Sequence, residues 1–133
     1  MIDGKDASTI VYSDVDHEIR ELVQLINNVP GIETTESCFG HNEMPCLIFM
    51  RAASIEDANW FMYKYFYNDP LWRVSLFITD TQIQEENWKE LKLVLESRYK
   101  DYPTVNLMVD SLTRRFRDIQ GDIGVKTPEG GSN

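Results

Sequence analysis

The most concentrated group of reactive side chains lies between residues 36 and 46. Cys38 and His41 stand three positions apart, and Cys46 follows five positions later. A thiolate beside an imidazole can act as a nucleophile with its general base, and the same side chains are zinc ligands. Three further residues could complete a metal site: His17, Glu36 and Glu43.

Neither kind of site has its usual sequence pattern. Structural zinc sites normally contain two pairs of ligands, and a catalytic cysteine normally meets its histidine from a distant part of the chain. In the third alternative, Cys38 is a reduced, partly buried thiol and His41 stabilises a turn. We therefore expect no catalytic residue, no metal and no cofactor, and we expect that the protein is not an enzyme.

Arginine side chains indicate a different chemistry, the recognition of an anion. Arg51 ends an apolar run, and Arg114 and Arg115 belong to the one dense basic cluster of an acidic chain. Guanidinium groups bind phosphate oxygens in pairs, and exposed amides around Gly40 could bind them as well. The alternative is that the cluster only offsets neighbouring aspartates and the dipole of a helix.

Aromatic residues are also abundant outside the expected core. Phe39 lies in a predicted loop and Phe77 on the polar side of a predicted strand, so both could stack on a nucleobase. The segment 55–67 is aromatic on more than one side, which favours a self-associating surface and a homo-oligomer. Its aromatic residues are Trp60, Phe61, Tyr63, Tyr65, Phe66 and Tyr67.

Composition limits the classes of partner. The net charge of −9 opposes sequence-independent binding to duplex nucleic acid, which requires basic side chains. No apolar run approaches the roughly 18 residues of a membrane span, and the polar start does not resemble a secretory signal. We expect a cytoplasmic protein that binds a small nucleotide and no membrane.

Hydrophobic periodicity predicts one α+β domain over residues 1–119 and a disordered tail over 120–133. Three helices are expected: one beginning at Ser13 and ending before 27–31, Ile55–Tyr67 and Pro103–Ile119. Strands are expected at Ser8–Tyr12, Ile32–Cys38, Cys46–Arg51, Leu71–Thr79 and, in a segment that also fits a helix, Glu90–Glu96. This order favours a mostly antiparallel sheet of four to six strands with about three packed helices.

The run from Pro30 to His41, PGIETTESCFGH, together with the strand Leu47-Ile48-Phe49, resembles the Thoeris anti-defence type one family of small phage and prophage proteins. The resemblance covers about Ser8 to Ile119. It implies a non-catalytic, oligomeric sponge that sequesters cyclic ADP-ribose isomers, and in some members cyclic oligonucleotides, in the cytoplasm of the host cell.

The turn Ser37-Cys38-Phe39-Gly40-His41 is also similar to one in the wybutosine-synthesis methyltransferase family, which modifies transfer RNA. This chain is shorter and more acidic than that family. Three classes of function therefore remain open: a nucleotide sponge, an RNA-modifying or thiol-dependent enzyme, and an oligomeric interaction module.

The chemistry of the side chains gives a hypothesis for the sponge. Phosphates would be held by Arg51, Arg114 and Arg115, the base by Phe39 and Phe77, and the mouth of the pocket would be shaped by Gly40 and His41. Loss of one charge-assisted hydrogen bond costs about 1.5–3 kcal/mol, so replacement of Arg115 by alanine should weaken nucleotide binding at least tenfold.

Overall fold

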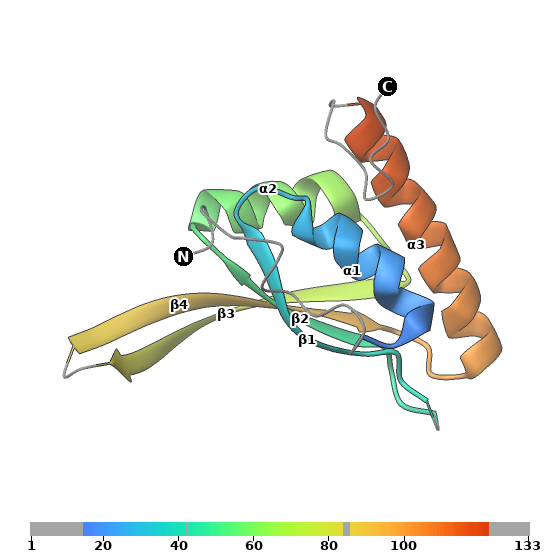
Figure 1. Ribbon diagram of the computed structural model, residues 1–133, viewed down its shortest axis with the longest axis horizontal. Coiled ribbons are helices and arrows are strands. Elements are labelled where there is room, and N and C mark those ends of the chain that lie inside the picture. Colours follow the sequence, from blue (N-terminus) through green and yellow to red (C-terminus); the bar gives the residue numbers. More distant parts are fainter. Residues whose placement is uncertain (1–14, 42, 84–85, 123–133) are drawn as a thin grey trace.

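A four-stranded antiparallel sheet forms the centre of the fold, and three α-helices cover one of its faces (Figure 1). The computed structural model describes residues 15–41, 43–83 and 86–122, and for 80–89 it describes the backbone alone. In chain order the elements are a 3-10 helix His17–Ile19, α1 Arg20–Asn27, β1 Ile32–Cys38, β2 Leu47–Ala52, α2 Ile55–Phe66, β3 Trp72–Ile83, β4 Glu86–Ser97 and α3 Tyr102–Asp122. The predicted α+β class is confirmed.

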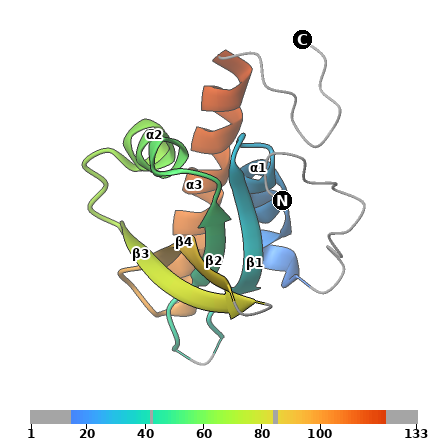
Figure 2. The same ribbon diagram turned by 90° about the vertical axis from the view of Figure 1, so that its left-hand side faces the viewer.

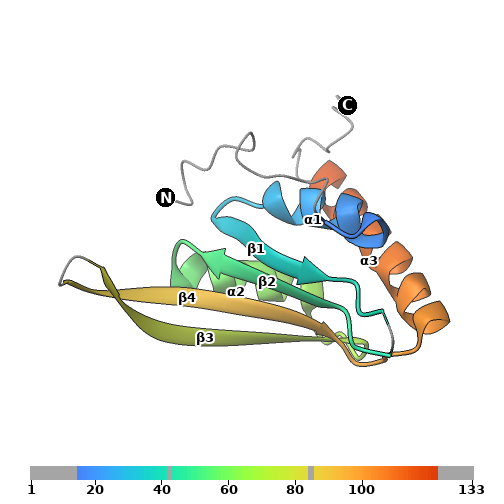
Figure 3. The same ribbon diagram turned by 60° about the horizontal axis from the view of Figure 1, so that its bottom comes forward.

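The strands lie in the order β1-β2-β4-β3, with every neighbouring pair antiparallel. Each hairpin is followed by a helix, so the chain contains two successive ββα units whose second strands, β2 and β4, pair at the centre of the sheet. The helices lie on one side of this sheet, and none of the described helices covers its other face (Figures 2 and 3).

The core lies between the sheet and the helices. Ile48 and Met50 of β2 and Leu93 and Leu95 of β4 are fully or almost fully buried, because alternate residues of a strand point to the same face. Phe116 of α3 packs among aromatic rings of α2 and stacks on Tyr65, with 4.2 Å between the ring centroids. The predicted apolar stripes of the first and last helices therefore contribute to one core.

Most predicted elements are present, with changes at their ends. The first described helical turn begins at His17, later than predicted, while Ser13 and the proposed strand Ser8–Tyr12 lie outside the described residues. Residues 90–96 form a strand, because Glu86–Ser97 pairs with β3 along its whole length and with β2 over part of it. Helix α3 continues to Asp122, so the predicted end of the domain at residue 119 is too early. Gln120 is buried and donates a hydrogen bond to the carbonyl of Leu25, and this tertiary contact extends the helix.

The β3–β4 hairpin extends beyond the rest of the sheet as an arm (Figure 1). Strand β2 pairs with β4 only from Leu91 onward, so residues 86–90 of β4 pair with β3 alone. Leu76, Phe77 and Ile78 are 38%, 49% and 59% exposed where the arm begins. Among the described residues, no helix is long and apolar enough to cross a lipid bilayer.

Candidate functional site

The turn between β1 and β2 is tightly fixed to the core. Phe39 is 1% exposed, and its ring makes an edge contact with Tyr102 at the start of α3. Its backbone amide donates a hydrogen bond of 2.8 Å to the carboxylate of Asp16. The prediction that Phe39 stacks on a base is therefore wrong for this structure, because neither face of the ring is exposed to a ligand.

Gly40 has a steric function in the same turn. Its φ is +93°, which L side chains rarely adopt, and a Cβ atom added there would lie 2.2 Å from the backbone oxygen of Met44. Gly40 is itself buried. Glycine is required at this position because two segments of the loop approach each other closely. A pocket mouth formed by the amide of Gly40 stays a prediction.

His41 joins the turn to the segment before α1. Its Nε2 atom lies 3.1 Å from Oε2 of Glu18, whose side chain is only 9% exposed, and His17 Nδ1 lies 3.5 Å from the other oxygen. Burial opposes ionisation of Glu18, but hydrogen bonds from His41 and from its own backbone amide, with His17 nearby, outweigh it. The pKa of Glu18 is therefore lowered. These contacts agree with the alternative in which His41 stabilises a turn.

The two thiols lie in different environments. Cys38 is exposed at the end of β1, and Cys46 is completely buried next to β2. Burial raises the pKa of Cys46 to about 12, so this thiol is protonated near neutral pH and is a poor nucleophile. Within the described part of the chain, no group of three or more His, Cys, Asp and Glu side chains is arranged to hold a metal ion.

The arginines of α3 lie in the helical layer, on the far side of the sheet from its open face. Arg115 Nη1 lies 2.6 Å from the carboxylate of Asp69, which is almost completely buried, and 2.9 Å from the carbonyl of Tyr65.

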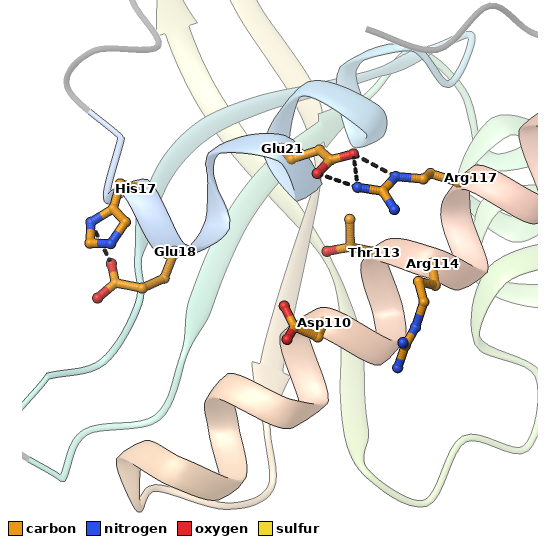
Figure 4. A pocket seen from close by; sticks show the side chains of 7 residues that line it. All are labelled: His17, Glu18, Glu21, Asp110, Thr113, Arg114 and Arg117. Atoms are coloured by element: carbon orange, nitrogen blue, oxygen red, sulfur yellow. Dashed lines mark hydrogen bonds and ion pairs between the residues drawn. The ribbon is translucent and has the colours of Figure 1, made fainter. Parts of the chain in front are cut away.

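Arg114 lines a polar groove of about 270 Å³ between α3 and the segment 17–21 (Figure 4). The other residues of this groove are His17, Glu18, Glu21, Asp110, Thr113 and Arg117. Arg117 holds Glu21 there through two hydrogen bonds of 2.5 and 2.6 Å.

The open face of the sheet brings two predicted site residues together. One row of side chains crosses all four strands: Glu33, Arg51, Lys92 and Phe77. Arg51 and Phe77 therefore flank Lys92 on the central strand β4. The neighbouring row contains Glu36, Phe49, Val94 and Ser75. Phe49 and Phe77 are 37% and 49% exposed, so both rings are accessible from this face.

A groove of about 440 Å³ runs over these rows, a volume within the range of about 300–1,000 Å³ for small-molecule sites. Its walls include Phe49, Phe77 and Val94, and its polar side chains are Thr35, Glu36, Thr79 and Lys92. Thr79, which also lines the groove, has a buried hydroxyl without a hydrogen-bond partner in the described structure.

On the same face, the buried Nε atom of Arg51 also lacks a partner among the described residues. Its Nη2 atom lies 3.1 Å from Oε1 of Glu33, so this carboxylate holds one end of the guanidinium, while the Nε–H group makes no hydrogen bond within the described structure. The open face thus combines exposed aromatic rings with two cations, Arg51 and Lys92, and two carboxylates, Glu33 and Glu36.

Sequence reasoning did not identify Phe49, Thr79 and Lys92. The signal for Phe49 was present, because Ile48 and Met50 on either side of it alternate toward the core. Lys92 becomes a neighbour of Arg51 and Phe77 only through the pairing of three strands, which the sequence does not state. Comparison with protein-family models, with curated proteins and with solved structures gave no match.

Proposed function

We propose that this protein is a non-catalytic binder of a small nucleotide and that the open face of its sheet holds the ligand. The observation that carries the proposal is the groove that the exposed rings of Phe49 and Phe77 line together with Lys92, a cation on a protein of net charge −9. Aromatic faces stack on nucleobases, and cationic side chains bind phosphates. Arg51, one strand away from Lys92, adds a second cation.

Tight binding without turnover would make the protein a sponge that withholds a signal from its receptor. On the resemblance to the Thoeris anti-defence type one family, the ligand would be a cyclic ADP-ribose isomer or a cyclic oligonucleotide, sequestered in the cytoplasm of a host cell. A sequestering protein requires affinity and a preorganised surface, and a rigid β-sheet provides such a surface.

The proposal is tested by calorimetric titration of the purified protein with cyclic ADP-ribose isomers and with cyclic di- and trinucleotides. We expect stoichiometric binding of at least one of them, and mass analysis after heat release should return the ligand unchanged.

Replacement of Phe77 by alanine should weaken binding about tenfold or more, since stacking contributes about 1–3 kcal/mol per base. The matched control is Tyr63→Ala on α2, which removes an exposed aromatic ring in the helical layer.

Equal affinity of Phe77→Ala and wild type would remove the open face from the binding site. Conversion of the ligand during incubation would support the enzymatic alternative instead. In that case Cys38→Ser should abolish the reaction if the exposed thiol is its nucleophile.

We also propose that the protein is a homo-oligomer, which favours an interaction module as the second candidate function. Leu76 and Ile78 point toward the helical side of the sheet where the arm leaves the body, and both are exposed. Strand β3 is an edge strand, whose free backbone groups can pair with another chain. A second copy that contributes its own β3 would cover the edge and both side chains.

Light scattering coupled to size-exclusion chromatography measures this association directly. Wild type should elute with the mass of a multimer, and Ile78→Lys should shift the mass to that of a monomer. Leu107→Lys is the control, because Leu107 is 69% exposed on α3 and lies away from the sheet edge. A monomeric wild type, or an unchanged mass for Ile78→Lys, would contradict the proposed interface.

A further inference from the structure

A second pocket, of about 220 Å³, lies at the end of the sheet where β4 leads toward α3. It is lined by Pro45, Arg73, Glu96, Ser97, Arg98 and Lys100. Three of these six side chains are cationic, and one is a carboxylate. The pocket is therefore a local positive site on a chain of net charge −9.

The cations of this pocket are available for a ligand. Arg73, Arg98 and Lys100 form no ion pair with any other described residue. Most other described cations do form ion pairs: Arg51 with Glu33, Lys92 with Glu90, Arg115 with Asp69 and Arg117 with Glu21. Arg98 and Lys100 are exposed, and so is Arg73 of β3. The carboxylate of Glu96 offsets only one of these three charges, so the cations around the pocket still repel one another, and a bound anion would relieve this repulsion.

The backbone beneath these side chains is firmly held. The hydroxyl of Ser97, a residue that is only 3% exposed, accepts a hydrogen bond of 2.8 Å from the amide of Cys46 and donates one of 2.7 Å to the carbonyl of Tyr99. The amide of Arg98 donates a bond of 2.9 Å to the carbonyl of Leu71. The segment that carries Arg98 and Lys100 is thus fixed to both neighbouring chain segments, so less entropy is lost when an anion binds.

We propose that this pocket is an anion site that binds a phosphate or pyrophosphate group through Arg73, Arg98 and Lys100. Guanidinium groups present two N–H donors in the geometry that phosphate oxygens accept, and an ammonium group adds a point charge. The volume is below the range of about 300–1,000 Å³ for sites that enclose whole small molecules, and it suits a charged group rather than a complete nucleotide.

The anion pocket borders the groove of the open face. Arg73 and Glu96 form the row next to Ser75 and Val94, and alternate residues of a strand are about 6.5–7 Å apart. A base near Phe77 and a phosphate near Arg73 would be separated by four residues of β3, or about 13 Å. One ligand could span both places as an extended nucleotide. The inference that one ligand spans both places rests on the proposed function, whereas the anion pocket does not depend on it.

Titration with inorganic pyrophosphate, adenosine and ADP tests the anion pocket and the spanning ligand separately. We expect pyrophosphate to bind and to shift the amide resonances of residues 97–100, and the double variant Arg98→Gln, Lys100→Gln should weaken this binding at least tenfold. Lys64→Gln is the matched control, since it removes an exposed charge on α2 and should leave the affinity for pyrophosphate unchanged. Adenosine should respond to Phe77→Ala and not to the double variant, and ADP should respond to both.

Equal affinity of wild type and the double variant for pyrophosphate would overturn the anion pocket, and so would the absence of pyrophosphate binding at low ionic strength. If adenosine still binds in either case, the proposed function stands without the pocket. If pyrophosphate binds as expected and no nucleoside or cyclic nucleotide binds, the pocket takes a free phosphate group and the nucleotide proposal fails. Binding of ADP that depends only on Arg98 and Lys100 would confirm the pocket and contradict a ligand that spans both places.

Discussion

Replacement of Gly40 by alanine is expected to lower the free energy of unfolding by about 3 kcal/mol or more. The φ of +93° is strained for any L side chain, and the new Cβ would lie within 2.6 Å of backbone atoms of Met44 and Pro45. These atoms cannot easily move away, because the amide of the following Cys46 is bonded to Ser97. Chemical denaturation followed by circular dichroism gives the change in free energy directly.

Gly121→Ala is the control for this substitution. Gly121 lies in α3, and a Cβ atom added there meets nothing within 4 Å. Alanine is a better helix former than glycine, so this variant should be as stable as wild type or more stable by about 0.5–1 kcal/mol. If Gly40→Ala unfolded at the same denaturant concentration as wild type, the loop would have another conformation in solution.

The elements of this fold could be predicted where their signals are local. Ser54 caps α2 by accepting a hydrogen bond from the amide of Asp57, and the same two residues mark the helix start in the sequence. The alternation of Leu91, Leu93 and Leu95 fits both a strand and a helix, and pairing with β2 and β3 decides for the strand. Local periodicity therefore identified the elements, and tertiary pairing decided the ambiguous one.

The candidate site could be predicted only in part. Phe77 and Arg51 were chosen because of their chemistry, and strand pairing places them on either side of Lys92. Phe39 was expected to be exposed because it follows a strand and precedes a glycine. Its burial depends on Asp16, 23 residues earlier, and on Tyr102 of α3, and no local pattern contains those contacts.

The contacts of Arg115, like those of Phe39, are contained in no local sequence pattern. Its replacement is expected to have a large effect on the free energy of unfolding. Replacement by alanine should lower the free energy of unfolding by about 2–3 kcal/mol, because it leaves the buried carboxylate of Asp69 without its counter-ion. The remaining partners of that carboxylate are the backbone amides of Leu71 and Trp72. The Arg115 side chain is 36% exposed, so the effect should be smaller than that of a fully buried pair.

The substitution of Arg115 distinguishes a structural role from a ligand-binding role. At a temperature where the variant is folded, its affinity for a nucleotide on the open face should equal that of wild type, because Arg115 lies in the helical layer on the other side of the sheet. Arg114→Ala should leave the stability within about 0.5 kcal/mol of wild type, since Arg114 is exposed. A double-mutant cycle with Asp69→Ala should give a clear coupling energy between Arg115 and Asp69. If Arg115→Ala were as stable as wild type but bound the nucleotide tenfold more weakly, Arg115 would be a ligand-binding residue, as the sequence alone predicts.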